Sequence, residues 1–292
     1  AIDENTGVYC PGSYTFGNRT YKCWRHSGHG AVSLNRAIGE SCDVYFYQVG
    51  QRVGVDALSE YAMKLGLGAK TGVEMEYEKE GLAPTKKWKL KNRKAKWQDG
   101  ETLSVAIGQG YNLVSPLQVC VMTSALANGG KVYRPKLVEQ VVDLEGTIVE
   151  NFAPELVSQL PGMEKYFKLI RKGMEEVVQG KAGTARNVAI EGLRIAGKTG
   201  TAQVVRLAQY RGLKEAAIPY EVRDHAWFTC YAPADNPEIA VTVLVEHGLH
   251  GGSGAGPIAR AILNQYFHGK LGVKAGGKVE PMIIDQDDGT IE

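Results

Sequence analysis

The most informative stretch of the sequence is RIAGKTGTAQ, residues 194–203. Its residues alternate in polarity as in a β-strand, and its two glycines lack the Cβ atom that would hold a ligand away from the backbone. Lys198 adds a positive charge, and Thr199 and Thr201 add hydroxyl groups that can bind an anion. The stretch predicts a strand edge that binds a substrate with a terminal carboxylate and a carbonyl group.

A second polar group stands upstream in the stretch ESCD, residues 40–43. It lies within residues 32–72, where apolar residues recur at the spacing of a helix. Ser41 and Asp43 therefore offer a hydroxyl and a carboxylate two residues apart on a predicted helix.

The composition is typical of a globular chain. The 292 residues are enough for one large domain or two small ones, and the formal net charge is +2. A charge this small gives no reason to expect a nucleic-acid partner. No apolar run reaches the roughly 18 residues of a membrane-spanning helix, and no signal-peptide pattern is present. Because the chain begins with Ala1, we expect it to be a piece of a longer protein.

The pattern of apolar residues predicts helices in the first half of the chain and strands in the second. Further helices are expected over residues 103–126, with a start at Ser115–Pro116, over 166–178, and from Pro257 to Phe267. Strands are expected over residues 193–205, 226–231 and 239–246, and a hairpin over 137–149. Residues 76–100, with the basic stretch 86–96, are expected to form a solvated loop, 251–256 a flexible loop and 276–292 a polar tail.

Seven segments stand in the order in which they occur in class B penicillin-binding proteins. They are GHG at 28–30, ESCDVYFYQ at 40–48, IGQGY at 107–111, SPLQ at 115–118, ANGG at 127–130, GKTGTAQ at 197–203 and DHAWF at 224–228. The chain resembles this family along most of its length, most of all the rod-elongation type of peptidoglycan D,D-transpeptidases. Many relatives have Asn at the position of Asp43, and the Asp resembles the residue found in the rod-elongation subgroup. The family's third motif, S-x-x-K, occurs nowhere in the sequence.

The resemblance implies an α/β (α+β) fold of the DD-peptidase/β-lactamase type. This fold is an antiparallel sheet flanked by helices, with a mostly helical subdomain. Residues 1–275 are expected to form a partial penicillin-binding transpeptidase domain, followed by the polar tail at 276–292. A fragment that begins after the family's nucleophile helix would also lose the first strands of the sheet, so we expect an uncovered sheet edge.

In the family, the serine of S-x-x-K attacks the penultimate D-Ala carbonyl of a peptidoglycan stem peptide, and β-lactams trap that serine. The resemblance implies that the catalytic residues are Ser41, Asp43, Lys198 and Thr201. It implies that the substrate carboxylate binds Lys198, Thr199, Gly200 and Thr201. Ser41 would relay a proton between the motif's lysine and Lys198, and the Thr201 N–H would be one oxyanion donor. No cofactor is expected for catalysis, and without its nucleophile the fragment is expected to be inactive alone.

The implied partners are peptidoglycan stem peptides, β-lactams and, in the full-length protein, membrane proteins of the elongation complex. The implied location is the periplasmic face of the bacterial inner membrane, with an anchor outside this chain. Three other functions fit parts of the sequence. A β-lactamase or β-lactam sensor would share the KTG motif, and a non-catalytic scaffold of the elongation complex would keep only the fold. Residues 192–199 also match a P-loop ATPase pattern, but the next residues are strand-like where a P-loop has a helix.

Cys10, Cys23, His29 and Cys42 form a candidate metal site with the spacing C-x₁₂-C-x₅-H-x₁₂-C. Three thiolates and one imidazole suit tetrahedral, structural zinc. The alternatives are a disulfide with one leftover thiol, as in an oxidising compartment, and buried thiols without a chemical role. Zinc bound through Cys42 would support the helix that carries Ser41.

Overall fold

The computed structural model describes residues 2–3, 5–204 and 217–268. At its centre is a three-stranded antiparallel sheet with the strand order β11-β10-β9. The strands are β9 (Ala196–Ala202), β10 (His225–Ala232) and β11 (Ile239–Val245). Among the described residues, no further strand pairs with the outer edge of β9 or of β11. The stretch that carries Lys198 therefore forms an edge strand.

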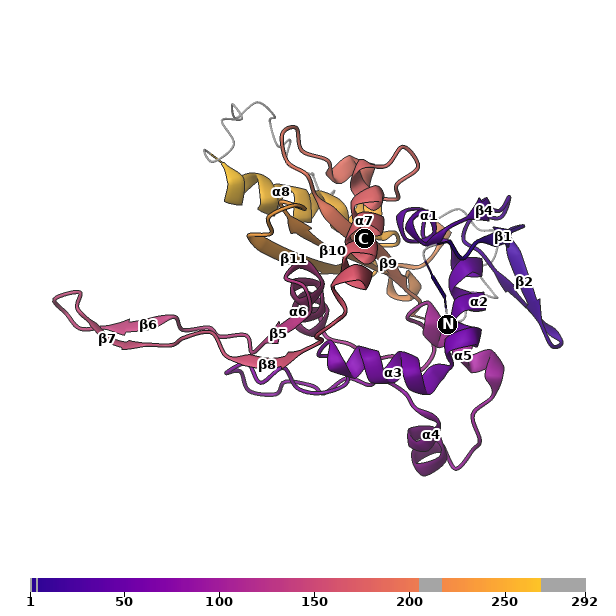
Figure 1. Cartoon of the computed structure of the whole chain (residues 1–292), viewed down its shortest axis with the longest axis horizontal. Coiled ribbons are helices and arrows are strands. Elements are labelled where there is room, and N and C mark those ends of the chain that lie inside the picture. The colour runs from indigo at the N-terminus through magenta and orange to yellow at the C-terminus, as the bar shows by residue number, and fades with distance from the viewer. Residues whose placement is uncertain (1, 4, 205–216, 269–292) are drawn as a thin grey trace, which may run out of the picture.

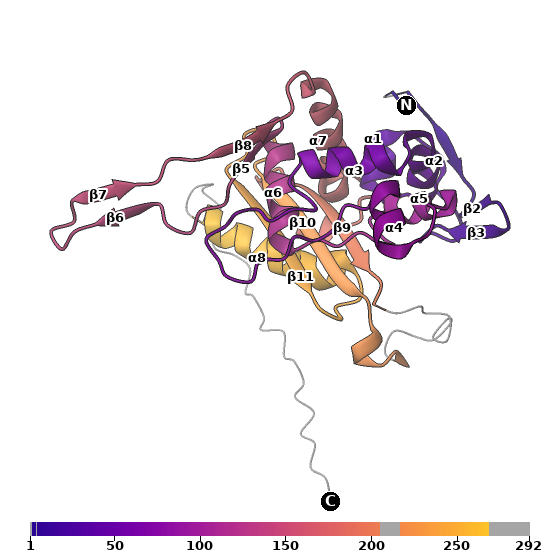
Figure 2. The ribbon, with the colours of Figure 1, turned by 90° about the horizontal axis from the view of Figure 1, so that it is seen from below.

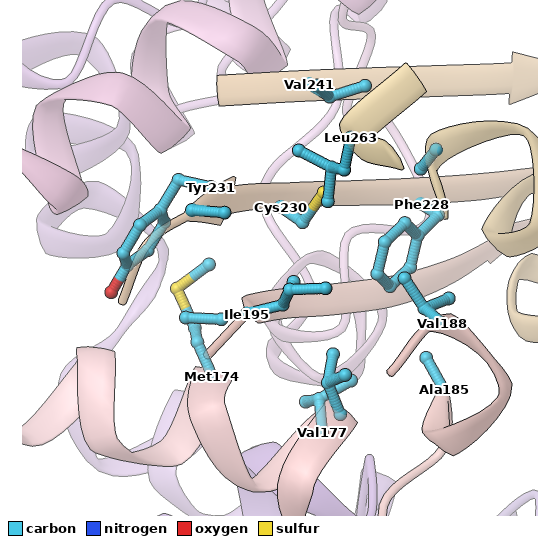
Figure 3. Packing of buried hydrophobic residues seen from close by; sticks show 14 of the residues in the cluster. Met174, Val177, Ala185, Val188, Ile195, Phe228, Cys230, Tyr231, Val241 and Leu263 are labelled. Carbon is cyan, nitrogen blue, oxygen red and sulfur yellow. The ribbon is translucent and has the colours of Figure 1, made fainter. Parts of the chain in front are cut away.

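Three helices pack around the sheet: α6 (Pro116–Ala127), α7 (Glu164–Gln179) and α8 (Gly256–Phe267) (Figure 1). Cys230 of β10 lies in one buried cluster with Leu263 of α8 and Val177 of α7 (Figure 3). The neighbouring residue Thr229 points to the opposite face, because its hydroxyl lies 2.7 Å from the hydroxyl of Thr123 on α6. Helices therefore pack on both faces of the sheet, while the outer edges of β9 and β11 are unpaired among the described residues.

A second hydrophobic core lies in the N-terminal part of the chain. Strands β1 (Val8–Cys10) and β4 (Gly30–Val32) pair with each other, as do β2 (Ser13–Phe16) and β3 (Arg19–Lys22). Helices α1 (Leu34–Gly39), α2 (Asp43–Val53) and α5 (Asp99–Ala106) complete this core, in which Tyr45 and Leu103 are fully buried. Because α1 also contacts α7, the two cores meet at the corner between α1 and α2.

The remaining elements lie at the periphery. They are α3 (Val55–Lys64), α4 (Lys86–Arg93), β5 (Lys131–Tyr133), β6 (Gln140–Val142), β7 (Ile148–Asn151) and β8 (Leu156–Gln159), with short helical turns at Arg186–Val188, Tyr220–Val222 and Gly251–Ala255. β5 pairs with β8 and β6 with β7, so the chain between them forms a hairpin that projects from the body (Figure 2). None of the described helices combines the length and apolar character needed to cross a membrane.

The fold confirms the expected antiparallel sheet flanked by helices. Helix α6 begins where the sequence predicts, because the Ser115 hydroxyl accepts the Gln118 N–H at 3.1 Å and Pro116 occupies the first turn. The predicted hairpin is present as β6 and β7. The boundary at residue 275 and the tail at 276–292 lie outside the described residues and stay predictions.

Parts of two predicted loops are helical, the predicted strand 193–205 is shorter than expected, and the predicted helix 103–126 is divided into α5 and α6 by the loop at 107–115. Residues 86–93 form α4 rather than a loop, because the Thr85 side chain caps the helix and the buried Lys89 ammonium pairs with Glu101 at 2.6 Å. Residues 251–255 form a π-helical turn that leads directly into α8. The strand begins only at Ala196. The sequence pattern did not predict α4, because most residues of this helix are charged and few apolar residues mark a buried face.

Replacing Leu263 by Ala should lower the free energy of unfolding by about 2–5 kcal/mol, because a fully buried side chain would leave a cavity beside the sheet. Its neighbour Ile262 is 41 % exposed, so Ile262→Ala on the same helix should change stability by about 0.5 kcal/mol or less. Urea unfolding followed by circular dichroism measures both values. Equal losses for the two variants would contradict the packing described.

Candidate active site and metal site

The Lys198 ammonium lies at the junction of the two cores. Its Nζ donates to the Ser41 Oγ at 2.5 Å and to the Thr199 carbonyl at 2.8 Å. Burial lowers the pKa of Lys198 to about 8, and the nearby Asp43 carboxylate opposes part of this shift. A lysine with a pKa near neutrality can donate or accept a proton at the Ser41 hydroxyl.

Ser41 has a backbone conformation that residues other than glycine rarely adopt. Its φ is 54°, in the left-handed region, directly after the end of α1. The N–H of Cys42 donates to the Ala37 carbonyl at 2.9 Å, and the N–H of Ser41 donates to Ile38 at 3.3 Å. This is a Schellman motif, in which the left-handed position is usually glycine. A serine here is strained in a way that is typical of functional residues.

Asp43 stands beside Lys198 but is fixed by another partner. Its Oδ2 accepts the backbone N–H of Trp24 at 2.8 Å. Burial raises the pKa of the Asp43 carboxyl to about 7, against the effect of the Trp24 N–H. Asp43 therefore acts on Lys198 through its charge, because no hydrogen bond between the two is present among the described residues.

The hydroxyl of Thr199 is shared between two neighbours. It lies 3.4 Å from the Ser41 Oγ and 2.9 Å from the Thr184 Oγ1. Sequence reasoning missed Thr184, because one threonine between α7 and β9 gives no signal.

Thr201 directs its backbone polar groups away from the sheet. The side-chain amide of Gln109 donates to the Thr201 carbonyl at 2.8 Å from outside the sheet. The N–H and C=O of one residue in an antiparallel strand point to the same side, so the Thr201 N–H also faces this free edge. The sequence analysis assigned no role to Gln109. Its neighbours Gly108 and Gly110 both have positive φ and form the turn that carries Gln109.

A cavity of about 950 Å³ adjoins this strand edge. Lys198, Thr199, Gly200 and Thr201 border it from β9, and Gln109 borders it from the loop after α5. The rest of the lining is mainly apolar and includes Leu34, Ile38, Phe46, Met122, Leu126 and Ile170. Its volume is at the upper end of the range for small-molecule sites, which is about 300–1,000 Å³.

The four residues of the candidate metal site come together, although they are spread over four segments. The ligand atoms of Cys10, Cys23, His29 and Cys42 all lie within 4.8 Å of one another, and all four side chains are buried. The His29 Nδ1 is 3.6 Å from the Cys10 sulfur and 3.5 Å from the Cys23 sulfur. All three cysteines are free. This buried Cys₃His cluster could bind a metal ion.

The electrostatics of the cysteines suit a metal ligand set. A hydrogen bond between the Cys23 and Cys42 sulfurs lowers the pKa of Cys23 and raises that of Cys42. One thiolate is therefore already favoured in the cluster before a cation enters, and a cation would favour the others. The ring of Trp24 packs edge-on against His29, so the same residue borders the cluster and holds Asp43.

The phosphate-loop interpretation of residues 192–199 is wrong. The chain continues from Thr199 through β9 to Ala202, where a P-loop would begin a helix. The backbone N–H groups that cradle phosphate in such proteins have no counterpart in an extended strand.

The model of the penicillin-binding protein transpeptidase domain matches residues 1–264. The chain belongs to the penicillin-binding protein transpeptidase family. The peptidoglycan D,D-transpeptidase MrdA of Haemophilus influenzae is 40 % identical over 275 residues, which are 92 % of this chain and 42 % of that protein. MrdA of Escherichia coli K12 is 34 % identical over 90 % of this chain and 41 % of its own length. The chain thus spans less than half of these curated relatives and is of the MrdA, or PBP2, type.

Solved structures of this family share the fold. PBP2 of Helicobacter pylori in complex with MreC aligns with a TM-score of 0.78 and 36 % identity, over 93 % of this chain and 46 % of that one. PBP2 of Pseudomonas aeruginosa aligns with a TM-score of 0.77 and 34 % identity, over 94 % of this chain and 56 % of that one. The expected DD-peptidase type of fold is confirmed.

The pKa of Lys198 provides a direct test of the site's electrostatics. Lysine side-chain NMR should give a midpoint near 8 for the signal that is lost in Lys198→Met. Asp43→Asn should move the midpoint lower, because the carboxylate stabilises the ammonium. A midpoint at the ordinary value of about 10.4 would contradict the burial described.

Proposed function

We propose that this chain is the greater part of a peptidoglycan D,D-transpeptidase catalytic domain that acts on D-Ala-D-Ala stem peptides and is trapped by β-lactams. The observation that carries the proposal is the hydrogen bond between Lys198 and the strained Ser41, beside the free edge of β9. Family membership supports the reaction class. Neither nucleic acid nor a catalytic cofactor has a role in this mechanism.

The residues of this chain bind the substrate and move a proton. The substrate carboxylate binds at Lys198, Thr199, Gly200 and Thr201, where a cation and hydroxyl groups meet on the strand edge. The Thr201 N–H donates to the developing oxyanion, a contribution of typically about 10²–10³ in rate. Ser41 passes a proton to or from Lys198, whose pKa near 8 is suited to that transfer. Asp43 tunes this pKa through its charge.

The nucleophile is a serine on an S-x-x-K segment that packs into the 950 Å³ cavity. An amphipathic helix would cover Leu34, Phe46 and Met122 with apolar side chains and bring its serine and lysine to Ser41. This arrangement explains why a large apolar hollow borders a polar strand edge. Without that segment the chain is inactive.

The proposal extends to location and partners. The complete protein works at the periplasmic face of the inner membrane with membrane proteins of the elongation complex. The relative from H. pylori forms a complex with MreC, and a further relative, 33 % identical, belongs to a peptidoglycan synthase complex. An inactive scaffold is less well supported, because the Lys198 ammonium donates to a strained Ser41, as expected for a site that transfers a proton. A β-lactamase or a β-lactam sensor is less well supported, because both MrdA relatives are transpeptidases.

A fluorescent penicillin should not acylate this chain alone but should acylate it within a longer polypeptide that carries the S-x-x-K segment. In that longer polypeptide, Lys198→Ala should slow acylation by about 10²-fold or more, because Lys198 both binds the carboxylate and exchanges the proton. The exposed Lys91→Ala is the matched control and should react normally. Intact mass spectrometry measures the adduct. A stoichiometric adduct on the isolated chain would contradict the proposal and show that the nucleophile is Ser41 or another serine of this sequence.

We propose further that the Cys₃His cluster binds one Zn²⁺. Four protein ligands fill a tetrahedral shell, so the ion has a structural role and leaves no position for water. Through Cys42, which directly precedes α2, it fixes the corner that carries Ser41.

Protein purified without added metal should contain about one zinc per chain. Cys23→Ser should lose most of it, whereas Cys120→Ser, outside the cluster, should keep it. Affinity should fall as the pH falls, because binding requires deprotonated thiols. Elemental analysis is the measurement, and less than about a tenth of an equivalent in the unaltered chain would end the zinc proposal.

A further inference from the structure

The hairpin between β5 and β8 continues outward as a long two-stranded ribbon, whose outer part, residues 137–157, is termed the arm. The Arg134 N–H donates to the Glu155 carbonyl at 2.9 Å, and the Phe152 N–H donates to the Glu139 carbonyl at 2.9 Å. Backbone hydrogen bonds therefore continue from the base to β6 and β7. Figures 1 and 2 show the arm leaving the body in two perpendicular views.

The tip of the arm is a defined turn. The Asp143 N–H donates to the Thr147 carbonyl at 3.0 Å, and the Asp143 Oδ1 accepts the Thr147 N–H at 2.7 Å. Gly146 has a φ of 84°, which this turn requires. Hydrogen bonds and a glycine in the required conformation therefore define the ribbon up to its tip.

The arm is exposed and rich in apolar side chains. Every residue from 137 to 151 is exposed. The exposed large apolar residues are Leu137, Val138, Val141, Val142, Leu144, Ile148, Val149, Leu156 and Val157. Val142 is paired with Ile148 and Val141 with Glu150, so apolar groups occupy both faces. A two-stranded ribbon is marginally stable alone, and apolar patches of this kind are characteristic of interaction sites.

The charge of the arm restricts what can bind there. Residues 137–157 contain the five acidic residues Glu139, Asp143, Glu145, Glu150 and Glu155 and no basic residue, which gives a formal charge of −5 against +2 for the whole chain. Among the described residues, Glu155 is paired with Arg134, and no ion pair reaches Glu139, Glu145 or Glu150. This charge opposes anionic lipid surfaces and a second copy of the arm.

We infer that the arm is a docking surface for an extended, basic segment of another protein, which adds as a strand to an open edge of the ribbon. The outer edges of β6 and β7 offer unpaired backbone groups for such an addition. Alternate β-branched side chains of the partner pack on Val142 and Ile148. Its lysines or arginines pair with Glu145 and Glu150. This inference does not depend on transpeptidase chemistry.

The test uses the whole chain and a labelled peptide of about ten residues in which valine and lysine alternate, a length that can pair along the arm. Fluorescence anisotropy should show binding that weakens as salt rises. Peptides with glutamate in place of lysine, or serine in place of valine, should bind at least about tenfold more weakly. Amide NMR should place the shift changes within residues 138–151.

Two variants of the arm complete the test. Glu145→Gln with Glu150→Gln removes charge, and Val142→Thr with Ile148→Thr removes apolar surface while keeping β-branched residues; each pair should weaken binding about tenfold. Matched changes at Glu74 and Glu76, which are exposed elsewhere on the chain, should have no effect. Equal affinity for all three peptides, shift changes away from the arm, or dimers of the chain that the apolar variant abolishes would overturn the inference. If the apolar variant abolishes dimers of the chain, the arm binds a second copy of the chain and not a basic partner.

Discussion

The contact between the Lys198 ammonium and the Ser41 hydroxyl joins two hydrophobic cores across 157 residues of sequence. Next to this contact, α1 packs closely on α7. A Cβ atom at Gly39 would lie 2.8 Å from the Glu176 Cβ, and one at Gly173 would lie 2.7 Å from Ile38. Because these glycines let the two helices approach, the corner that carries Ser41 reaches β9. A larger residue at either position would move Ser41 away from Lys198.

The candidate active site and the candidate metal site are adjacent. Cys23 lies in the Cys₃His cluster, and the next residue, Trp24, holds Asp43 through its backbone N–H. Asp43 in turn opposes the loss of positive charge at Lys198. An ion in the cluster would therefore fix the position of a carboxylate that raises the pKa of Lys198. In the proposed function, the cluster stabilises the fold and the strand edge takes part in acyl transfer.

Local patterns made much of this architecture predictable. The alternation around Lys198 and the capping box at Ser115 act within a few residues, so the sequence alone predicts the edge strand and the start of α6. Family resemblance supplied the pairing of Ser41 with Lys198, because no local rule relates residues so far apart. The roles of Thr184 and Gln109 depend on tertiary contacts and left no periodic signal. Alternation also predicted the hairpin of the arm, but its projection from the body depends on what packs around it.

In the proposed function, Thr201 and its strand neighbours bind the reacting group of the substrate. A crystal structure of the β-lactam adduct, formed in the longer polypeptide with the S-x-x-K segment, tests it most directly. We expect the acyl carbonyl oxygen at about 2.7–3.1 Å from the Thr201 nitrogen, with the carboxylate on the Thr199 and Thr201 hydroxyls. A carbonyl oxygen directed away from β9, or a carboxylate bound elsewhere, would contradict it.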